Sequence, residues 1–166
     1  MTRAGYGMDA ALYVQSASPV SMDSTFIQRS DSTKYKMLKN NVIVFVCEHG
    51  AAKSVIAATY FNKMAEESNL ELRAIARGTN PDAQLSANTI AGLHTDGLMA
   101  AEMVPRKLSP ADLESPQRII TFCELPDEYR SKTAIEQWDR VPPVSEDYEK
   151  ARDAIVERIY RLIKTI

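Results

Sequence analysis

The sequence predicts an α/β domain built as a three-layer sandwich, with a four-stranded parallel sheet and helices on both faces. Two observations support this fold class. The chain has 166 residues, which is close to the usual size of one domain. From residue 42 onward, short apolar runs alternate with segments of helical period, as in right-handed crossovers between parallel strands. Ligands bind at the carboxyl ends of such strands, so functional residues are expected directly after them.

The first two strands and the helix between them are predicted near the start of this pattern. Residues 42–46 form an unbroken apolar, β-branched run, which is typical of a central strand buried on both faces. A helix is predicted over residues 54–67, where apolar residues keep i,i+4 spacing. Residues 70–76 are then expected to form the second strand.

A second helix is predicted to begin after Asn80, which would be its N-cap. Pro81 would take the first helical position and Asp82 would add a favourable charge to the first turn, while Gly97 would end the helix. The buried face of this helix would be formed by Ala83, Ala87, Ile90 and Ala91.

The last third of the chain completes the alternation. Ser109 and Pro110 open a shorter helix, and strands are predicted over residues 118–123 and 134–138. The C-terminal helix has the clearest period, because apolar residues recur at steps of three and four: Tyr148, Ala151, Ile155, Ile159, Leu162 and Ile166.

Composition excludes several classes of protein. The 20 basic and 22 acidic residues give a net charge of -2, which argues against a nucleic-acid binder and against a membrane-surface protein. No apolar run is long enough to span a membrane, and the N-terminus lacks the apolar run of a secretory signal. We therefore expect a cytoplasmic protein. A monomer or a weak dimer is a separate expectation that these observations do not address.

The first 40 residues differ from the rest of the chain, because they contain many serines and show no sustained helical or strand period of apolar residues. They are predicted to be a disordered extension, with residues 41–166 forming the domain. Subtracting the five basic and three acidic residues of this segment leaves 15 basic and 19 acidic residues, a net charge of -4. The predicted domain is therefore mildly acidic.

The loop after the first strand is the most informative part of the sequence, and it reads Cys47-Glu48-His49-Gly50-Ala51-Ala52-Lys53-Ser54. Small and flexible residues let the backbone curl with its N–H groups pointing inward, and the following helix adds its positive end. Such a loop can hold an anion. A thiol beside these N–H groups and an ammonium has its pKa lowered from about 8.5 to roughly 3.5–7.5. Cys47 is therefore a candidate nucleophile, although a lone cysteine at a strand end is commonly a small buried hydrophobe.

Cys47 and Cys123 are the two cysteines of the chain. They are too few for a disulfide scaffold, and neither lies in a cluster of Cys and His with zinc spacing, so no metal site is predicted. Cys123 ends the third predicted strand. Each cysteine is therefore either a core residue or part of the chemistry.

Four features occur in the order that one protein family shows: Cys47 with Lys53 and Ser54, the run Ala76-Arg77-Gly78-Thr79, Leu108 with Asp112, and Asp139 nine residues before Tyr148. Over about residues 42–166 the chain resembles the low-molecular-weight protein tyrosine phosphatases and the thiol-linked arsenate reductases of the same fold. The family's loop is a cysteine, five residues, an arginine and a serine between a strand and a helix. Its second motif is Ser-Ala-Gly-Thr.

This resemblance implies a strand order of 2-1-3-4 and a metal-free phosphatase reaction without a cofactor. Cys47 would attack phosphorus and carry a phosphocysteine, Ser54 would hydrogen-bond the thiolate, and Asp139 would protonate the leaving group. The phosphate oxygens would be held by Lys53 and by the loop residues Glu48, His49, Gly50, Ala51 and Ala52. The substrate would be a phosphorylated protein or a small phosphomonoester.

The acid is the least defined of these roles. Asp139 also fits an ordinary turn residue before Pro142 and Pro143, and Asp127 is the second choice.

Three residues depart from the family's pattern: Lys53 replaces the arginine, Gly50 replaces an asparagine, and Arg140 replaces a proline. A point charge cannot grip two oxygens as a guanidinium fork does. Losing one charge-assisted hydrogen bond costs about 1.5–3 kcal/mol, roughly one to two decades in rate. The sequence thus also allows a catalytically weak anion-binding domain.

Arsenate reduction is the alternative enzymatic reading. The resemblance places Cys123 beside the first strand, but Arg130 stands seven residues later, where the reductases carry the next cysteine of their disulfide relay. Cys47 would attack arsenate, and either Cys123 or an external small thiol would resolve the adduct. A direct disulfide needs Cα atoms within roughly 7 Å, and Cys123 also fits a buried structural residue.

Overall fold

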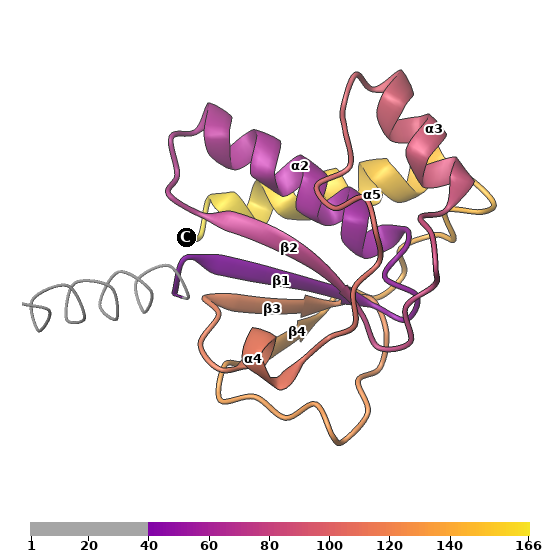
Figure 1. The fold of residues 1–166 in the computed structure, drawn as a ribbon. Coiled ribbons are helices and arrows are strands. Elements are labelled where there is room, and N and C mark those ends of the chain that lie inside the picture. The colour runs from indigo at the N-terminus through magenta and orange to yellow at the C-terminus, as the bar shows by residue number, and fades with distance from the viewer. Residues whose placement is uncertain (1–39) are drawn as a thin grey trace, which may run out of the picture.

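A four-stranded parallel sheet forms the centre of the computed structural model, which describes residues 40–166. The strand order is β2-β1-β3-β4, as predicted (Figure 1), with the strands β1 (Val42–Cys47), β2 (Arg73–Gly78), β3 (Arg118–Thr121) and β4 (Ile135–Gln137). Except for Asn40, the segment predicted to be disordered lies outside the described residues, so that expectation stays a prediction.

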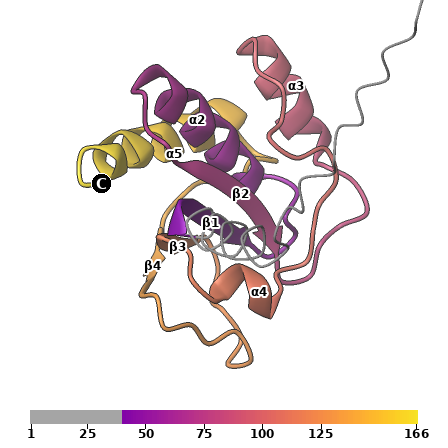
Figure 2. The ribbon, with the colours of Figure 1, turned by 60° about the vertical axis from the view of Figure 1, so that its left-hand side comes forward.

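The helices lie on both faces of this sheet, which confirms the predicted three layers. Figures 1 and 2 show α2 (Lys53–Glu67) and α5 (Tyr148–Ile163) on one face, with α3 (Ala87–Thr95) beside them. The other face is covered by the short helix α4 (Pro110–Leu113) and by the chain between β3 and β4.

Strand β1 is buried on both faces, and this explains its unbroken apolar sequence. Ile43 and Phe45 pack into the core beneath α2 and α5, whereas Val44 and Val46 pack into the smaller core beneath α4. All four side chains are fully buried. The strand therefore carries its carboxyl end, and the loop after it, on a rigid support.

Helix α5 confirms the apolar stripe predicted from the sequence. Ala151, Ile155, Ile159 and Leu162 are buried, and the Asp147 carboxylate caps the helix by accepting a hydrogen bond of 3.0 Å from the Lys150 N–H. Ile166 lies beyond the end of the helix.

A partly buried carboxylate joins three helices. Asp96, at the end of α3, accepts hydrogen bonds of 2.7 Å from the hydroxyls of Tyr60 and Tyr148 and one of 2.9 Å from Arg152. Burial alone would raise the pKa of Asp96, but these donors hold it below its usual range. The group ties α3 to α2 and α5.

The second strand was predicted too early, over residues 70–76. It spans Arg73–Gly78, because the end of α2 continues as a turn: Asn69 has φ +53° and the Leu70 N–H donates to the Ala65 carbonyl. The chain needs residues 70–72 to reverse its direction before it can pair with β1.

The helix predicted to start after Asn80 was also wrong in its position. The backbone N–H groups of Asn80 and Asp82 donate to the carbonyls of Glu48 and His49, so this segment is tied to another loop. Helix α3 begins only at Ala87, with Ser86 as its N-cap residue. Its buried residues are Thr89 and Leu93, while the face expected to be buried is exposed: Ala83, Ala87, Ile90 and Ala91.

Candidate active site

The loop between β1 and α2 is held by its carbonyl groups. The carbonyls of Cys47, Glu48, His49 and Ala51 accept hydrogen bonds of 2.8–3.2 Å from backbone N–H groups of the 79–86 segment. Within residues 40–166, the backbone N–H groups of residues 48–55 donate to no other protein group. The carbonyls thus turn toward the 79–86 segment, and the N–H groups of the loop and of the first turn of α2 stay free. This is the arrangement of an anion-binding loop at a helix N-terminus.

A contact between two glycines gives the loop its shape. Gly50 has φ +59°, and a Cβ atom added to it would lie 2.9 Å from the Gly78 backbone nitrogen. A Cβ atom on Gly78 would lie 2.8 Å from the Gly50 nitrogen. The two backbones approach so closely that neither residue has room for a side chain.

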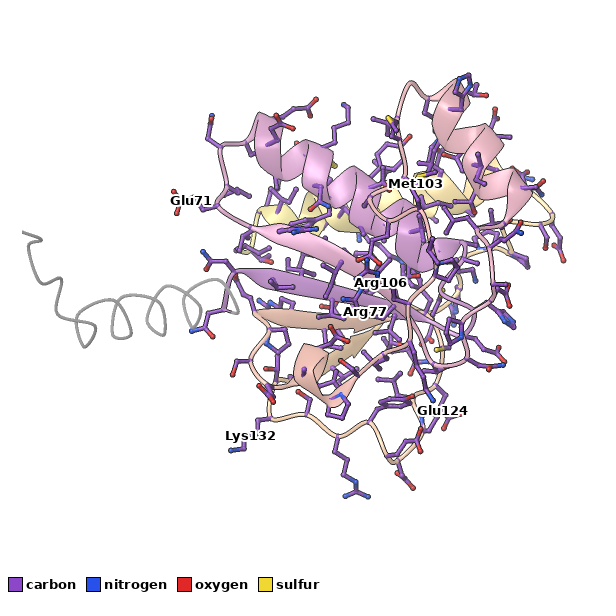
Figure 3. All side chains as sticks on the ribbon, in the orientation of Figure 1. Glu71, Arg77, Met103, Arg106, Glu124 and Lys132 are labelled. Carbon is purple, nitrogen blue, oxygen red and sulfur yellow. The ribbon has the colours of Figure 1, made fainter. Side chains whose placement is uncertain are left out.

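Gly78 is itself held from the opposite side. Its N–H donates to the Arg106 carbonyl and its carbonyl accepts from the Leu108 N–H. The neighbouring Arg77 pairs with Glu102 at 2.9 Å and with Asp112 at 3.1 Å. Figure 3 shows Arg77 and Arg106 together near the end of β2.

The predicted nucleophile and its predicted partner are in contact. The Cys47 Sγ lies 3.0 Å from the Ser54 Oγ, and both residues are buried. Cys47 is the last residue of β1 and Ser54 lies in the first turn of α2, so the loop brings the two ends together.

Lys53 reaches across the site to another part of the chain. Its Nζ donates a hydrogen bond of 2.7 Å to the Val141 carbonyl, which lies after β4. Burial lowers the pKa of the Lys53 ammonium below its usual range, while the thiol groups of Cys47 and Cys123, when ionised, act in the opposite direction. Lys53 is thus a cation at the site that also anchors the 139–141 segment.

Both cysteines line one cavity of about 210 Å³. Cys123, just after β3, shares its wall with Lys53 and Phe122, and with the loop residues Cys47, Glu48, His49 and Ala52. Burial raises the pKa of the Cys123 thiol, and the charges of Cys47 and Glu48 act in the same direction. We call this cavity the thiol pocket.

The other predicted loop residues take different positions. His49 is exposed and its Nδ1 lies 3.2 Å from the Asp82 carboxylate. Gly50 and Ala51 are buried, so they contribute backbone rather than side chains to the loop.

The two predicted acids do not line the thiol pocket. Asp139 is exposed and lies in a separate cavity between β4 and α5, where its carbonyl accepts from Arg158. Arg140, which follows it, has φ +62°. Asp127 is exposed and lies 3.8 Å from Arg130.

Sequence reasoning missed three contributors to this site: the 79–86 segment, Phe122 and Val141. The prolines after Val141 and the turn residues near Asn80 signalled loops. Their contacts with Lys53 and the 47–54 loop are long-range and leave no local pattern.

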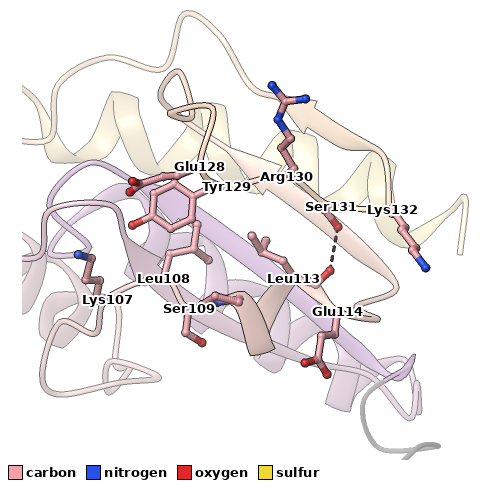
Figure 4. A pocket seen from close by; sticks show the side chains of 11 residues that line it. Lys107, Leu108, Ser109, Leu113, Glu114, Glu128, Tyr129, Arg130, Ser131 and Lys132 are labelled. Atoms are coloured by element: carbon pink, nitrogen blue, oxygen red, sulfur yellow. Dashed lines mark hydrogen bonds between the residues drawn. The ribbon is translucent and has the colours of Figure 1, made fainter.

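A larger cavity of about 680 Å³ lies elsewhere, between α4 and residues 128–132 (Figure 4). Its wall includes Leu108 and Tyr129 and contains no cysteine. Ser131, which also lines this cavity, donates a hydrogen bond of 2.8 Å to the Leu113 carbonyl. Neither cysteine lines this cavity, so the smaller thiol pocket remains the candidate site.

Residues 42–157 match the family model described as low molecular weight phosphotyrosine protein phosphatase. The chain belongs to this family. The match confirms the resemblance seen in the sequence, and it supports a cysteine-based phosphatase or arsenate reductase. No curated protein matches the chain.

Solved structures similar to the chain come from both branches of this fold. An arsenate reductase from Archaeoglobus fulgidus is 25% identical, with a TM-score of 0.59, and the match covers 74% of this chain and 98% of the other. A low molecular weight protein tyrosine phosphatase from T. tengcongensis is 17% identical, with a TM-score of 0.60 and coverages of 75% and 99%. A thioredoxin-dependent arsenate reductase from Corynebacterium glutamicum is 18% identical, with a TM-score of 0.58 and coverages of 85% and 73%.

Residues 40–166 lack two further features. No group of three or more His, Cys, Asp and Glu side chains there could hold a metal ion. No helix in that part of the chain is both long and apolar enough to cross a membrane.

Replacing Gly50 by alanine should destabilise the protein more than the same change at Gly97. Both residues have positive φ, but a Cβ atom at Gly97 meets nothing within 4 Å. Gly97→Ala should therefore lower the free energy of unfolding by about 1 kcal/mol, the cost of a left-handed backbone for alanine. Gly50→Ala should lower it by about 2–4 kcal/mol, because the added Cβ atom also displaces Gly78. Urea unfolding measures both, and equal losses would contradict the close contact.

Cys123 should react slowly with iodoacetamide at neutral pH, because its raised pKa leaves the thiol protonated there. An ordinary thiol has a pKa of about 8.5, and the alkylation of Cys123 should accelerate only at a pH above this value. Peptide mass analysis after alkylation at several pH values follows Cys123 separately, and the urea-unfolded protein is the control. If the alkylation rate of Cys123 depends on pH in the same way in the folded and the unfolded protein, the raised pKa is contradicted.

Proposed function

We propose that the protein is a cysteine-dependent phosphatase that hydrolyses phosphotyrosine or a similar phosphomonoester through a phosphocysteine intermediate. The observation that carries this proposal is the contact of 3.0 Å between Cys47 Sγ and Ser54 Oγ, at the base of a loop whose N–H groups are free. A hydroxyl donor lowers the energy of a thiolate, and the N–H groups suit the equatorial oxygens of a phosphoryl group.

In the first step, the Cys47 thiolate attacks phosphorus and the bond from phosphorus to the leaving oxygen breaks. The leaving oxygen takes a proton, and the alcohol or phenol departs. Water then attacks the phosphocysteine, which releases inorganic phosphate and restores the thiolate. The loop N–H groups and Lys53 would stabilise the charge on the phosphoryl oxygens in both steps.

Two carboxyl groups could supply the proton. Asp139 is our candidate, although it lines a different cavity from Cys47. To reach the leaving group, residues 139 and 140 have to turn toward Cys47 while the Val141 carbonyl stays bound to Lys53. Glu48 already lines the thiol pocket and is the rival donor. A proton donor of this kind contributes typically about 10²–10⁴-fold.

A second candidate function, arsenate reduction, is favoured by Cys123, which lines the same cavity as Cys47. Cys47 would displace hydroxide from arsenate and form a sulfur–arsenic bond. A second thiolate, from Cys123 or an external small thiol, would attack the Cys47 sulfur, and the electron pair of the broken bond would reduce As(V) to As(III). The resulting disulfide would be reduced by the external thiol, which acts as a co-substrate.

Two variants separate these functions. Cys47→Ser should lower phosphate release from p-nitrophenyl phosphate at least about a thousandfold, because no nucleophile remains. Cys123→Ser should leave that activity within about twofold, because Cys123 takes no part in hydrolysis. In the same preparations, arsenite formation from arsenate with a small thiol measures the second function.

Phosphate release that depends on Cys47 but not on Cys123 supports the phosphatase. Arsenite formation without phosphate release supports the reductase instead. If phosphate binds and neither reaction turns over, the protein is an anion-binding domain and the proposal fails.

Asp139→Asn should lower hydrolysis of phenyl phosphate much more than hydrolysis of p-nitrophenyl phosphate, because only the poorer leaving group needs the proton. Turnover numbers for both substrates measure this ratio. Glu48→Gln is the matched control and should leave the ratio unchanged. The opposite pattern would assign the proton to Glu48.

Lys53→Arg should raise kcat/KM for p-nitrophenyl phosphate by about ten- to a hundredfold, because a guanidinium can hold two phosphoryl oxygens at once. Lys63→Arg makes the same change on the exposed face of α2, where Lys63 pairs with Glu67, and should have no effect. A loss of activity in Lys53→Arg would contradict this expectation. It would show that the hydrogen bond from Lys53 to the Val141 carbonyl matters more than a second hydrogen bond to the phosphoryl group.

A further inference from the structure

A second cavity, of about 510 Å³, lies between the edge strand β4 and the last turns of α5. Four arginines line it: Arg118, Arg140, Arg158 and Arg161. The lining carboxylates are Glu136 and Asp139, so cations exceed anions there, although the sequence after residue 40 carries a net negative charge. We call this cavity the arginine groove.

The arginines have free hydrogen-bonding capacity. Within residues 40–166, the side chains of Arg118 and Arg140 have no hydrogen-bond or ion-pair partner. Arg158 is held in place, since its Nη2 donates to the Asp139 carbonyl and its guanidinium lies 5.9 Å from the centre of the Trp138 ring. Its buried Nη1 has no acceptor in that part of the chain. The guanidinium groups of Arg118 and Arg140 are therefore available to an anionic ligand, and Arg158 adds a fixed positive charge to the wall of the groove.

The remaining charges are partly engaged. Glu136 accepts a hydrogen bond of 2.7 Å from the Trp138 indole, and Arg161 pairs with Glu157 at 2.5 Å. Both members of the second pair are well exposed, so that ion pair is weak and can be exchanged for another anion.

The cations are spread along the groove. Arg118 comes just before Ile119, which pairs with Ile135 at the start of β4, and Arg140 follows the end of that strand. Their backbone positions are therefore separated by at least the length of β4, roughly 10 Å. An elongated ligand with several negative charges matches this spread better than a single phosphate ion does.

The groove also borders a strand edge that no other strand of residues 40–166 covers. All three residues of β4 are exposed, and β4 is the last strand of the sheet. The Trp138 N–H donates to the Thr121 carbonyl of β3, and successive N–H groups along a strand alternate in direction, so that of Gln137 points away from the sheet. An extended peptide could add there as a further strand.

We propose that the arginine groove binds an extended acidic segment of a protein partner, which adds along the free edge of β4. The arginines would contact its carboxylates while the β4 backbone would pair with its backbone. A nucleic acid fits less well, because Trp138 is buried and offers no open ring on which a base could stack. The inference does not rest on the chemistry at Cys47, although the proposed acid Asp139 also lines the groove.

Fluorescence anisotropy with a labelled peptide of about eight alternating Glu and Val residues tests the proposal on the full chain. Binding should saturate, weaken as salt is raised, and be lost when Gln replaces Glu in the peptide. The double variant Arg118→Gln with Arg161→Gln should bind about three- to tenfold more weakly. Its matched control, Arg73→Gln with Arg130→Gln, removes the same charge from exposed positions outside the groove and should bind as the natural protein does.

Nuclear magnetic resonance locates the peptide independently of any variant. Backbone shifts should concentrate on residues 135–140 and on the second half of α5. Shifts centred on the 47–54 loop would overturn the proposal and would instead report anion binding at the thiol pocket. Equal weakening in the two double variants, or tighter binding of an oligothymidine than of the acidic peptide, would also overturn it.

Discussion

The contact between the backbones of Gly50 and Gly78 is the constraint on which the rest of the site depends. It brings the 47–54 loop against the end of β2, where the following segment can donate to the loop's carbonyls. With the carbonyls engaged on that side, the N–H groups remain available to an anion on the other. The contact of Cys47 with Ser54 and the reach of Lys53 toward Val141 both follow from this folded loop.

Residues 139–141 connect the arginine groove with the thiol pocket. Asp139 and Arg140 belong to the arginine groove, while the Val141 carbonyl holds Lys53 at the thiol pocket. A lysine in this position provides a point charge, and here part of its hydrogen-bonding capacity is used within the protein. If Lys53 binds the phosphoryl group as proposed, the same ammonium also holds, through Val141, the segment that carries the proposed acid Asp139.

Local patterns predicted the fold and the position of the 47–54 loop, whereas the features that the sequence missed depend on long-range contacts. The apolar residues of β1 and the apolar stripe of α5 are the residues that are buried, so the sequence pattern predicts these elements directly. Cys47, Lys53 and Ser54 lie in one short segment between a strand and a helix. The helix expected after Asn80 was displaced because its first N–H groups serve the carbonyls of Glu48 and His49. The position of Asp139 depends on the left-handed backbone of Arg140 and on a hydrogen bond from Arg158 of α5. The spacing of residues in the sequence predicts neither of these two features.

We propose that the 47–54 loop holds a tetrahedral anion against the Cys47 thiol. The rate of Cys47 alkylation by iodoacetamide, followed by peptide mass with and without phosphate or arsenate at constant ionic strength, tests this directly. Either anion should slow alkylation of Cys47 in a saturable manner, and chloride at the same ionic strength should not. Alkylation of Cys47 at the same rate in all three salts would contradict it.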